Sequence, residues 1–380
     1  MATTDASKPA KGPEDLGVDP GRLEHATALI EGWCKQGLIP GATLCIARNG
    51  HVLVQRGFGE IIALARRDAR REPTRPDTIF LIASPTKPVT AAAVCLLVER
   101  GRLLLEDPVS AIIPEFRGGE RERVRIRHLL THTSGLPDML PENVELRSRH
   151  APVHAFAEGA CTTPLLYNPG SDCRYQSMGI ALLGAIVERI AGVPLREFIA
   201  RELFQPLGMV DSWLGLGPLP RERVAQVRLP AEDAATSWNW NSDYWRDLGA
   251  PWGGMHSTVG DYMRFMQMLL DGGRYSGRQI LSRPMVETIL ADHIATLSGM
   301  SEEGRLEHAW GLGWRLNRPR GAFRLPEIAS PRTFGHPGST GTVAWADPDS
   351  GLACALFTSQ PAAGRLLGLA SNAVAAVVMG

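Results

Sequence analysis

The strand-forming segments of this chain lie near its two ends, which limits the folds that it can adopt. Residues 42–48 and 51–56 flank the dipeptide Asn49-Gly50, which predicts a β-hairpin with a tight type I′ turn. A second strand pair is predicted within residues 342–358, and the long middle of the chain is patterned mostly for helices. The economical architecture is α+β: an antiparallel sheet built from both chain ends, flanked by helices, with a mostly helical domain inserted.

Predicted helices support this arrangement. Asp19-Pro20 supplies a cap and a first-turn proline for a first helix, and a last helix is expected at about 362–378. Further helices are predicted at 179–190 and 258–270. The expected regions are a disordered or loosely attached N-terminus (1–18), a discontinuous α/β sheet domain (19–105 and 305–380) and a mostly helical domain (106–304). A functional site is expected in the crevice between the two lobes.

Lys87 is the only lysine after Lys35, in a stretch that holds 35 arginines. Arginine stays protonated in proteins, whereas a desolvated lysine can become a neutral base. Ser84 lies three residues earlier, and residues at this spacing share one face of a helix. If Ser84 opens that helix, Pro85 sits where its missing N–H costs nothing, and unpaired helix N–H groups lie beside the hydroxyl. The pattern indicates an activated nucleophile; the alternative is an N-cap serine followed by a surface lysine.

Two further segments carry groups that such a nucleophile needs. Tyr175-Gln176-Ser177 precedes a predicted helix, and a phenol near a cationic lysine is stabilised as phenolate and can accept a serine proton. The alternative is that Ser177 caps the helix and Tyr175 packs. In segment 335–341, glycines allow a strand edge to approach a ligand and a backbone N–H to point at an oxyanion. The alternative there is an ordinary glycine turn.

These signals occur in the order S-x-x-K, Y-x-S and H-x-G. Together they resemble the serine β-lactamase and penicillin-binding-protein superfamily, particularly class C β-lactamases and the related family VIII carboxylesterases. Further matching phrases are IRHLLTHTSGL (126–136), FQPLGM (204–209) and GGMHST (253–258). The similarity runs from about Asp19 to the C-terminus. It implies a β-lactamase/transpeptidase-like fold, and no cofactor is expected.

The resemblance also implies roles for single residues. Ser84 would be the acylated nucleophile, and Lys87 and Tyr175 would form the proton-transfer pair, with the proton assigned to neither. The backbone N–H groups of Ser84 and Ser339 would form the oxyanion hole. Each such donor is typically worth ~3 kcal/mol of transition-state stabilisation.

The sequence departs from the family pattern at two places. His336-Pro337-Gly338 stands where β-lactamases and D,D-peptidases usually carry lysine-threonine-glycine, and Ser177 stands where class C enzymes usually have asparagine. A largely neutral histidine is a poor anion partner, and Pro337 has neither a hydroxyl nor an N–H. We therefore expect a carboxylesterase acting on small neutral esters. A β-lactamase or D,D-peptidase-like amide hydrolase, or an acyltransferase, is the alternative on the same site.

An aromatic cluster between Ser237 and Gly253 is the candidate wall of an acyl or alcohol pocket. Its members are Trp238, Trp240, Tyr244, Trp245 and Trp252. Trp252 joins Ser177, His336, Gly338 and Ser339 as the residues predicted to contact substrate or oxyanion. The alternative is that the aromatic side chains pack the loop on its own domain.

Composition excludes several other functions. The formal net charge is zero and the basic residues are dispersed, so there is no electrostatic footprint for nucleic acid. Six scattered cysteines read as buried free thiols, and no metal site is predicted. The rivals are a metallohydrolase using His128 and His132 and a non-catalytic scaffold on the same fold. With no predicted membrane span and no visible signal peptide, a cytoplasmic location is expected. The expected partner is a small-molecule ester; the oligomeric state is left open.

Overall fold

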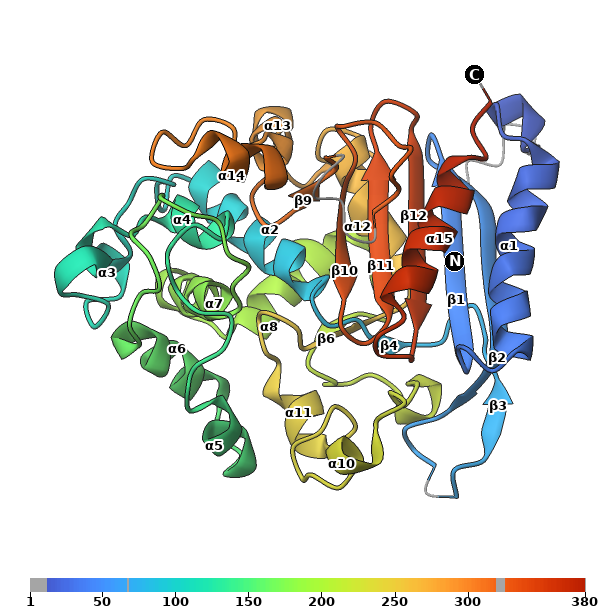
Figure 1. Ribbon diagram of the computed structural model, residues 1–380, viewed down its shortest axis with the longest axis horizontal. Coiled ribbons are helices and arrows are strands. Elements are labelled where there is room, and N and C mark those ends of the chain that lie inside the picture. Colours follow the sequence, from blue (N-terminus) through green and yellow to red (C-terminus); the bar gives the residue numbers. More distant parts are fainter. Residues whose placement is uncertain (1–11, 67, 319–324, 380) are drawn as a thin grey trace.

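A seven-stranded antiparallel sheet organises the protein (Figure 1). The computed structural model describes residues 12–66, 68–318 and 325–379. In the order β3-β2-β1-β12-β11-β10-β9, the strands are β3 (Arg71–Pro73), β2 (His51–Ile62), β1 (Gly41–Arg48), β12 (Leu352–Thr358), β11 (Thr342–Asp347), β10 (Phe334–Gly338) and β9 (Arg315–Leu316). β1 and β12 pair antiparallel, so segments from the two ends of the chain meet inside the sheet. The predicted antiparallel sheet is confirmed.

The hairpin of β1 and β2 has the predicted turn. Asn49 and Gly50 have φ angles of 50° and 80°, and two consecutive positive values are typical of a type I′ turn. β2 continues to Ile62, beyond the predicted end at Arg56. The extension forms because residues 57–59 pair with β1 and residues 60–62 pair with β3.

Helices cover both faces of the sheet. They are α1 (Pro20–Lys35) and α15 (Gly364–Ala375) on one face and α12 (Val259–Leu270) on the other. Side chains alternate along β1: Leu44 and Ile46 pack in the core shared with α1 and α15, whereas Cys45 and Ala47 pack in the core shared with α12. α12 therefore covers the sheet although it falls within 106–304, and the domain boundaries stay a prediction.

A mostly helical part lies beside the sheet (Figure 1). Its helices, with the remaining short ones, are α2 (Thr86–Glu99), α3 (Val109–Ile112), α4 (Ile126–Leu130), α5 (Asn143–Ser148), α6 (Val153–Thr162), α7 (Met178–Ala191), α8 (Leu195–Ile199), α9 (Gln205–Leu207), α10 (Ala231–Ala234), α11 (Asp243–Leu248), α13 (Arg283–Leu290) and α14 (Glu302–Glu307). The smaller sheets consist of β4 (Phe80–Leu81), β6 (Met255–Ser257) and β5 (Trp213–Leu214), and of β7 (Arg274–Tyr275) and β8 (Arg278–Gln279). The helices predicted at 179–190 and 258–270 are confirmed as α7 and α12.

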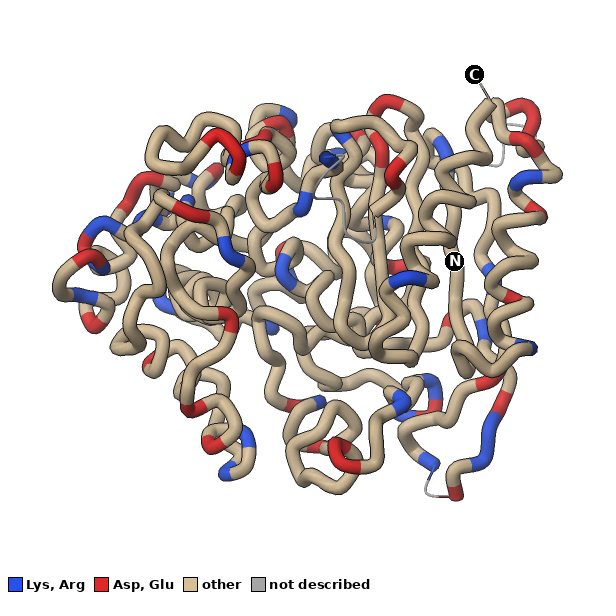
Figure 2. Tube along the Cα trace, in the orientation of Figure 1, with Lys and Arg blue, Asp and Glu red and all other residues tan. Residues whose placement is uncertain are grey.

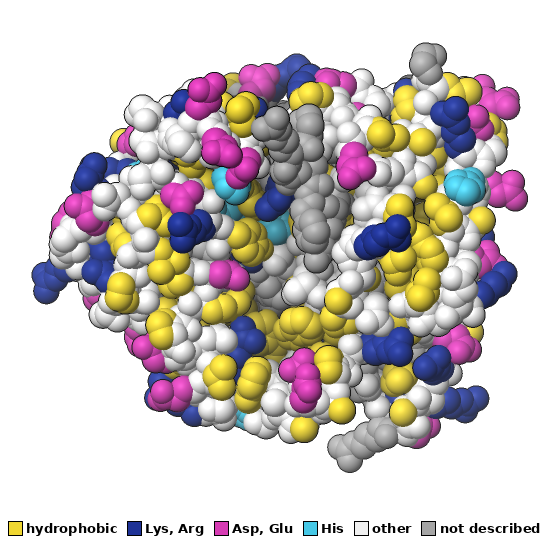
Figure 3. Space-filling model, in the orientation of Figure 1, with side chains coloured by type: hydrophobic (Ala, Val, Ile, Leu, Met, Phe, Trp, Pro, Cys, Tyr) yellow, Lys and Arg dark blue, Asp and Glu magenta, His cyan; other side chains and the backbone are white. Residues whose placement is uncertain are grey.

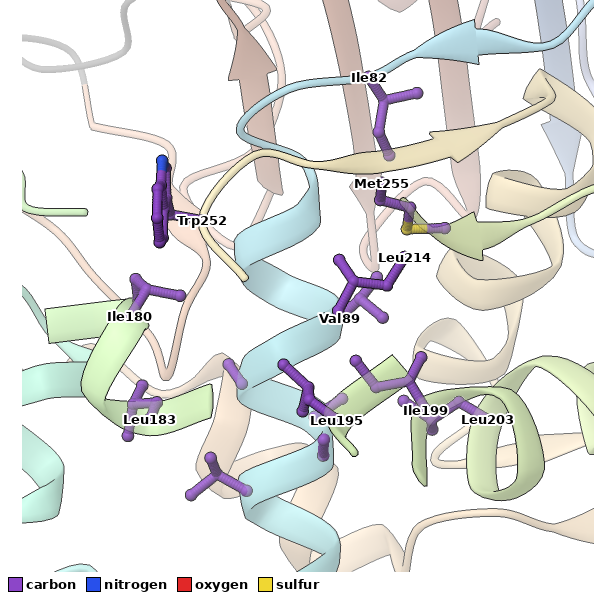
Figure 4. Close-up of a cluster of buried hydrophobic side chains, with 14 of the residues drawn as sticks. Ile82, Val89, Ile180, Leu183, Leu195, Ile199, Leu203, Leu214, Trp252 and Met255 are labelled. Carbon is purple, nitrogen blue, oxygen red and sulfur yellow. The ribbon is translucent and has the colours of Figure 1, made fainter. Parts of the chain in front are cut away.

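α2 is a buried helix at the centre of this part. Every residue from Thr86 to Leu97 is buried. Figure 4 shows apolar side chains gathered around α2, among them Ile180 of α7 and Leu195 of α8. A helix that is apolar on all sides belongs to a core. The first turn of α2, which carries Lys87, is therefore fixed inside the protein.

The chain ends lie close together. Val18 is fully buried and forms a β-bridge with Val378. Leu16 and Val18 are also part of the hydrophobic core, so this segment is fixed to the rest of the protein, in contrast to the loose N-terminus expected for 1–18. The rest of that prediction, residues 1–11, lies outside the described residues.

Basic and acidic residues are interspersed along the described part of the chain. Figure 2 shows Lys and Arg positions mixed with Asp and Glu positions along the trace. All six cysteines are free thiols, and all except the half-buried Cys34 are buried. Within the described residues, no single helix is long and apolar enough to cross a membrane, and only the bent pair 178–191 and 195–207 reaches that length and composition together.

Candidate active site

Ser84 lies in the loop between β4 and α2. The helix begins at Thr86, so Ser84 precedes it and does not open it as predicted. Ala83 has a φ of 54°, a left-handed conformation that costs roughly 1–2 kcal/mol for a residue with a side chain. The spacing to Lys87 is nevertheless helical, because the Lys87 N–H donates to the Ser84 carbonyl at 2.9 Å. The loop is a sharp turn that leaves Ser84 half-buried.

Buried hydroxyl groups hold this loop in place. Thr342 Oγ1 donates to Ile82 O at 2.6 Å, and the Tyr262 hydroxyl donates to Pro85 O at 2.8 Å. The first bond comes from β11 and the second from α12, so the main sheet and a sheet helix both fix the turn. A strained backbone persists only where its surroundings determine it in this way.

Lys87 contacts Ser84 from the first turn of α2. Its Nζ lies 3.3 Å from Ser84 Oγ and 2.8 Å from Trp252 O. The side chain is 1% exposed, and burial lowers the pKa of Lys87 to about 7, against an opposing effect of the Asp138 carboxylate. A substantial fraction of Lys87 is therefore neutral near neutral pH, as a general base requires.

Tyr175 lies on the other side of Ser84. Lys87 Nζ lies 4.5 Å from the centroid of the tyrosine ring, and the Ser84 side chain interacts with the Tyr175 hydroxyl so as to lower its pKa. Burial raises the pKa of Tyr175, and the interaction with Ser84 and the charge of Arg315 offset this only in part. The neutral phenol is therefore favoured. Of the two alternatives left open for the proton, a phenolate at Tyr175 is opposed by desolvation.

Ser339 directly follows β10, whose last residue, Gly338, lies against the loop that carries Ser84. Gly338 lies so close to the loop that a Cβ atom there would be 2.3 Å from Ile82 O. Within the described residues, the backbone N–H groups of Ser84 and Ser339 have no acceptor. Two free donors at this place suit an oxyanion.

The predicted substrate-binding residue His336 and its neighbour Pro337 lie on the edge of β10. β9 pairs only with Phe334 and Gly335, so the β9-facing edge is free at Pro337, where a residue without N–H is tolerated. His336 Nδ1 lies 2.8 Å from the Pro337 carbonyl and so carries the proton. Burial holds the pKa of His336 well below its ordinary value, helped by the nearby Lys87 charge. His336 is therefore uncharged.

His132, one of the two histidines of the metallohydrolase alternative, also lies here. Its ring centroid is 4.8 Å from that of Tyr175 and 4.2 Å from that of Trp310, and its Nδ1 accepts the Gln176 N–H at 3.2 Å. Burial keeps the pKa of His132 well below its ordinary value. Across the part of the chain that the structure describes, no three His, Cys, Asp or Glu side chains could hold one metal ion.

Asp138 is a site residue that the sequence did not reveal. Its Oδ1 accepts a 2.6 Å hydrogen bond from Ser177 Oγ, and its carboxylate is exposed. The predicted substrate-binding residue Ser177 thus holds a carboxylate toward Lys87. No motif spacing links Asp138 to Tyr175; the only signal was its position just after the matching phrase that ends at Leu136.

Arg315 is the second residue that the sequence did not reveal. It pairs with Gly335 across β9 and β10, and its guanidinium lies 5.0 Å above the ring of Trp310. Its positive charge acts on Tyr175 and His336. One arginine among so many carried no distinguishing signal in the sequence.

The aromatic side chains of the predicted cluster lie in three separate places. The Trp252 side chain is 2% exposed and packs against Phe156, with ring centroids 5.3 Å apart, so only its backbone carbonyl reaches Lys87. Figure 4 shows it beside Ile180. Trp238 and Trp240 instead line a separate cavity, and the other two members pack the loop on the segment 147–151.

Figure 3 shows a hollow between the sheet and the helical part, with histidine and Lys/Arg side chains beside it and hydrophobic side chains at its lower end. The Ser84 loop and β10 also meet between these two parts of the protein.

A family model described as Beta-lactamase matches residues 25–377. The chain belongs to this family. It is a serine hydrolase of the beta-lactamase family, with the α+β fold that the sequence predicted.

Individual relatives differ in their described activities. "Esterase EstB" from Burkholderia gladioli is 38% identical over 199 residues, 48% of this chain and 49% of that protein. A "Putative D-alanyl-D-alanine carboxypeptidase" from Salmonella typhi is 26% identical over 388 residues, 92% of this chain and 85% of that protein. A solved family VIII carboxylesterase covers 95% of this chain and 98% of its own, with a TM-score of 0.76 and 21% identity, which shows the fold.

Proposed function

We propose that this hydrolase is a carboxylesterase that cleaves small neutral esters through an acyl-enzyme on Ser84. Ser84 Oγ attacks the ester carbonyl as its proton passes to Lys87, while the N–H groups of Ser84 and Ser339 stabilise the oxyanion. Collapse of the adduct breaks the ester C–O bond, and the leaving alcohol takes the proton. Water then attacks the acyl-enzyme in the same way and releases the carboxylic acid.

The assignment of the base rests on two opposite effects of burial. Burial brings the pKa of Lys87 down to about 7 but raises that of Tyr175. A neutral amine is therefore accessible near neutral pH and a phenolate is not. In this proposal Tyr175 is a neutral hydroxyl, hydrogen-bonded to Ser84, that can relay the proton to the leaving group.

The proposed choice of substrate rests on the two residues at the edge of β10, His336 and Pro337. A β-lactam or peptide carboxylate needs a cation and a hydroxyl, and this edge offers the uncharged His336 and Pro337. The exposed Asp138 carboxylate adds a negative charge near Lys87. Both features disfavour anions and leave a neutral ester unaffected. The similarity to Esterase EstB over half of the chain supports the same choice.

One observation favours a second candidate, a β-lactam or peptide hydrolase. Arg315 lies next to β10 and acts electrostatically on Tyr175 and His336. A carboxylate could pair with this guanidinium in place of the missing lysine. The similarity to the Salmonella protein over 92% of the chain agrees with that reading.

The deciding experiment compares kcat/KM for p-nitrophenyl butyrate with kcat/KM for nitrocefin and a cephalosporin at one pH. A missing charge-assisted hydrogen bond weakens binding by roughly 1.5–3 kcal/mol, so we expect the ester to be preferred by at least about ten- to hundredfold. A β-lactam that equals the ester would reject the esterase proposal. Arg315→Ala would then show whether Arg315 holds the carboxylate, by losing β-lactam turnover while keeping ester turnover.

A further inference from the structure

A second cavity lies outside the catalytic cluster. Its volume is about 120 Å³. It is lined by Arg147, Leu229, Asp233, Thr236, Trp238, Asn239 and Trp240. Apolar cavities of roughly 150 Å³ hold a benzene molecule, so this space suits a single six-membered ring. None of the lining residues belongs to the Ser84, Lys87 and Tyr175 cluster.

Among the described residues that line this cavity, Arg147 is the only basic one. Its guanidinium lies 4.4 Å from the ring of Trp245 and 5.9 Å from that of Trp238. Stacking covers the faces of a guanidinium and leaves its edge for a planar acceptor. The side-chain contact at this edge is weak, a 3.9 Å approach of Nη2 to Met139 Sδ, and Nε is buried without an acceptor.

No carboxylate neutralises this arginine. Within the described residues Arg147 forms no ion pair, and Asp233, on the wall of the same cavity, is not paired with it. Burial lowers the pKa of Arg147, and Tyr244 and Asp138 oppose this effect. Arg147 is half-buried and lacks a carboxylate partner, so its guanidinium edge suits a bound anion.

We propose that the cavity between Arg147, Trp238 and Trp240 is a binding site for a small aromatic carboxylate, held by its ring against the indoles and by its carboxylate on the guanidinium edge. Arg147 provides the charge and the geometry for a two-pronged contact. The tryptophans provide apolar area and π-stacking. The site is separate from the catalytic cluster, so its occupation does not depend on the reaction at Ser84.

Calorimetric titration of the full-length Ser84→Ala protein with sodium benzoate tests this site, since no turnover can interfere. We expect benzoate to bind at least tenfold more tightly than benzamide, which has the ring without the charge, and than acetate, which has the charge without the ring. Arg147→Ala should weaken benzoate binding by at least tenfold. Arg149→Ala, an exposed arginine two residues away, is the matched control and should leave it unchanged.

Two variants make the test sharper. Asp233→Asn removes the like charge from the cavity wall and should tighten benzoate binding by a few-fold, and Trp238→Leu should weaken it. An unchanged melting temperature in the Ser84→Ala background, and wild-type ester hydrolysis when the same substitution is made with Ser84 intact, show that each variant is folded. Equal binding of benzoate and benzamide, or full binding by Arg147→Ala, would overturn the proposal. Loss of binding in Arg315→Ala alone would assign the anion to the catalytic hollow and would also overturn it.

Discussion

The side of the site that carries Ser84 and the side that faces it differ in how completely their polar groups are paired. On the Ser84 side, Lys87 Nζ contacts the Trp252 carbonyl at 2.8 Å, and Thr342 holds the Ile82 carbonyl at 2.6 Å. These groups are buried and cannot bond to water, so their hydrogen bonds are formed within the protein. The protein itself fixes this side.

On the facing side, several polar groups lack partners. The Nε2 atoms of His132 and His336 are buried and have no hydrogen-bond partner within the described residues, and Asp138 and Ser339 are exposed. An unpaired buried polar atom costs roughly 1–3 kcal/mol, and a ligand that pairs with it recovers this cost. Changes on the Ser84 side should therefore slow every substrate, whereas changes on the facing side should alter which substrates are accepted.

The largest effect is expected for Ser84→Ala. Removal of the nucleophile should lower kcat by at least about 10⁴-fold for every ester. Among the residues that the structure describes, no other hydroxyl group contacts Lys87 and could replace it. The melting temperature should be unchanged, since Ser84 is only half-buried. Steady-state kinetics on a panel of p-nitrophenyl esters measures the loss. A variant that keeps more than a few per cent of the activity would remove Ser84 from the mechanism.

Lys87→Arg should be nearly as damaging as Lys87→Ala, a loss of roughly 10²- to 10⁴-fold. Arginine keeps the charge but cannot become the neutral base that burial makes of Lys87. In the wild type, kcat/KM should rise with pH through about 7, as Lys87 loses its proton. An arginine variant with most of its activity would make Lys87 an electrostatic partner only and leave the proton to Tyr175.

The sequence predicted the parts of the fold that local patterns encode. The Asn49-Gly50 turn and the periodicity of α7 and α12 are properties of short segments, and the structure agrees with them. The role of α12 as a cover for the sheet could not be predicted in the same way. It depends on contacts with β1, far before α12 in the sequence, and with β12, far after it.

The same difference between local pattern and tertiary contact applies to the residues of the candidate site. Ser84 and Lys87 were found because a spacing of three residues brings them together whatever the rest of the fold is. Asp138 and Arg315 were missed because only tertiary folding brings them near Tyr175. The proton could be assigned to neither Lys87 nor Tyr175 for the same reason: the sequence revealed a cationic neighbour of the phenol but not the burial that raises the pKa of Tyr175.

Thr342→Val tests whether the Ser84 side depends on its hydroxyl clamps. The change leaves the buried Ile82 carbonyl without a donor and should lower the free energy of unfolding by about 1–3 kcal/mol. Slight displacement of the Ser84 loop should also lower kcat by roughly tenfold for all esters. Val374→Ala in α15, a core truncation of similar cost, is the control and should keep full kcat. Equal kcat in the two variants would show that the clamp is structural only.

The smallest effect is expected for Asp138→Asn, on the facing side. This carboxylate raises the pKa of Lys87 against the larger effect of burial, so its removal should lower that pKa further below about 7. The acid limb of kcat/KM should move to lower pH. The ratio of activity at pH 6 to activity at pH 8 should rise by roughly two- to fivefold, a modest change because Asp138 is exposed and screened.

The same substitution should change selectivity in favour of anions. Loss of the negative charge should lower KM for a carboxylate-bearing ester and leave KM for p-nitrophenyl butyrate unchanged. The asparagine can still accept the bond from Ser177, so a purely structural role would move neither the pH profile nor the selectivity. An unchanged acid limb together with unchanged anion discrimination would show that the exposed carboxylate does not control recognition. The facing side would then owe its substrate preference to the β10 edge alone.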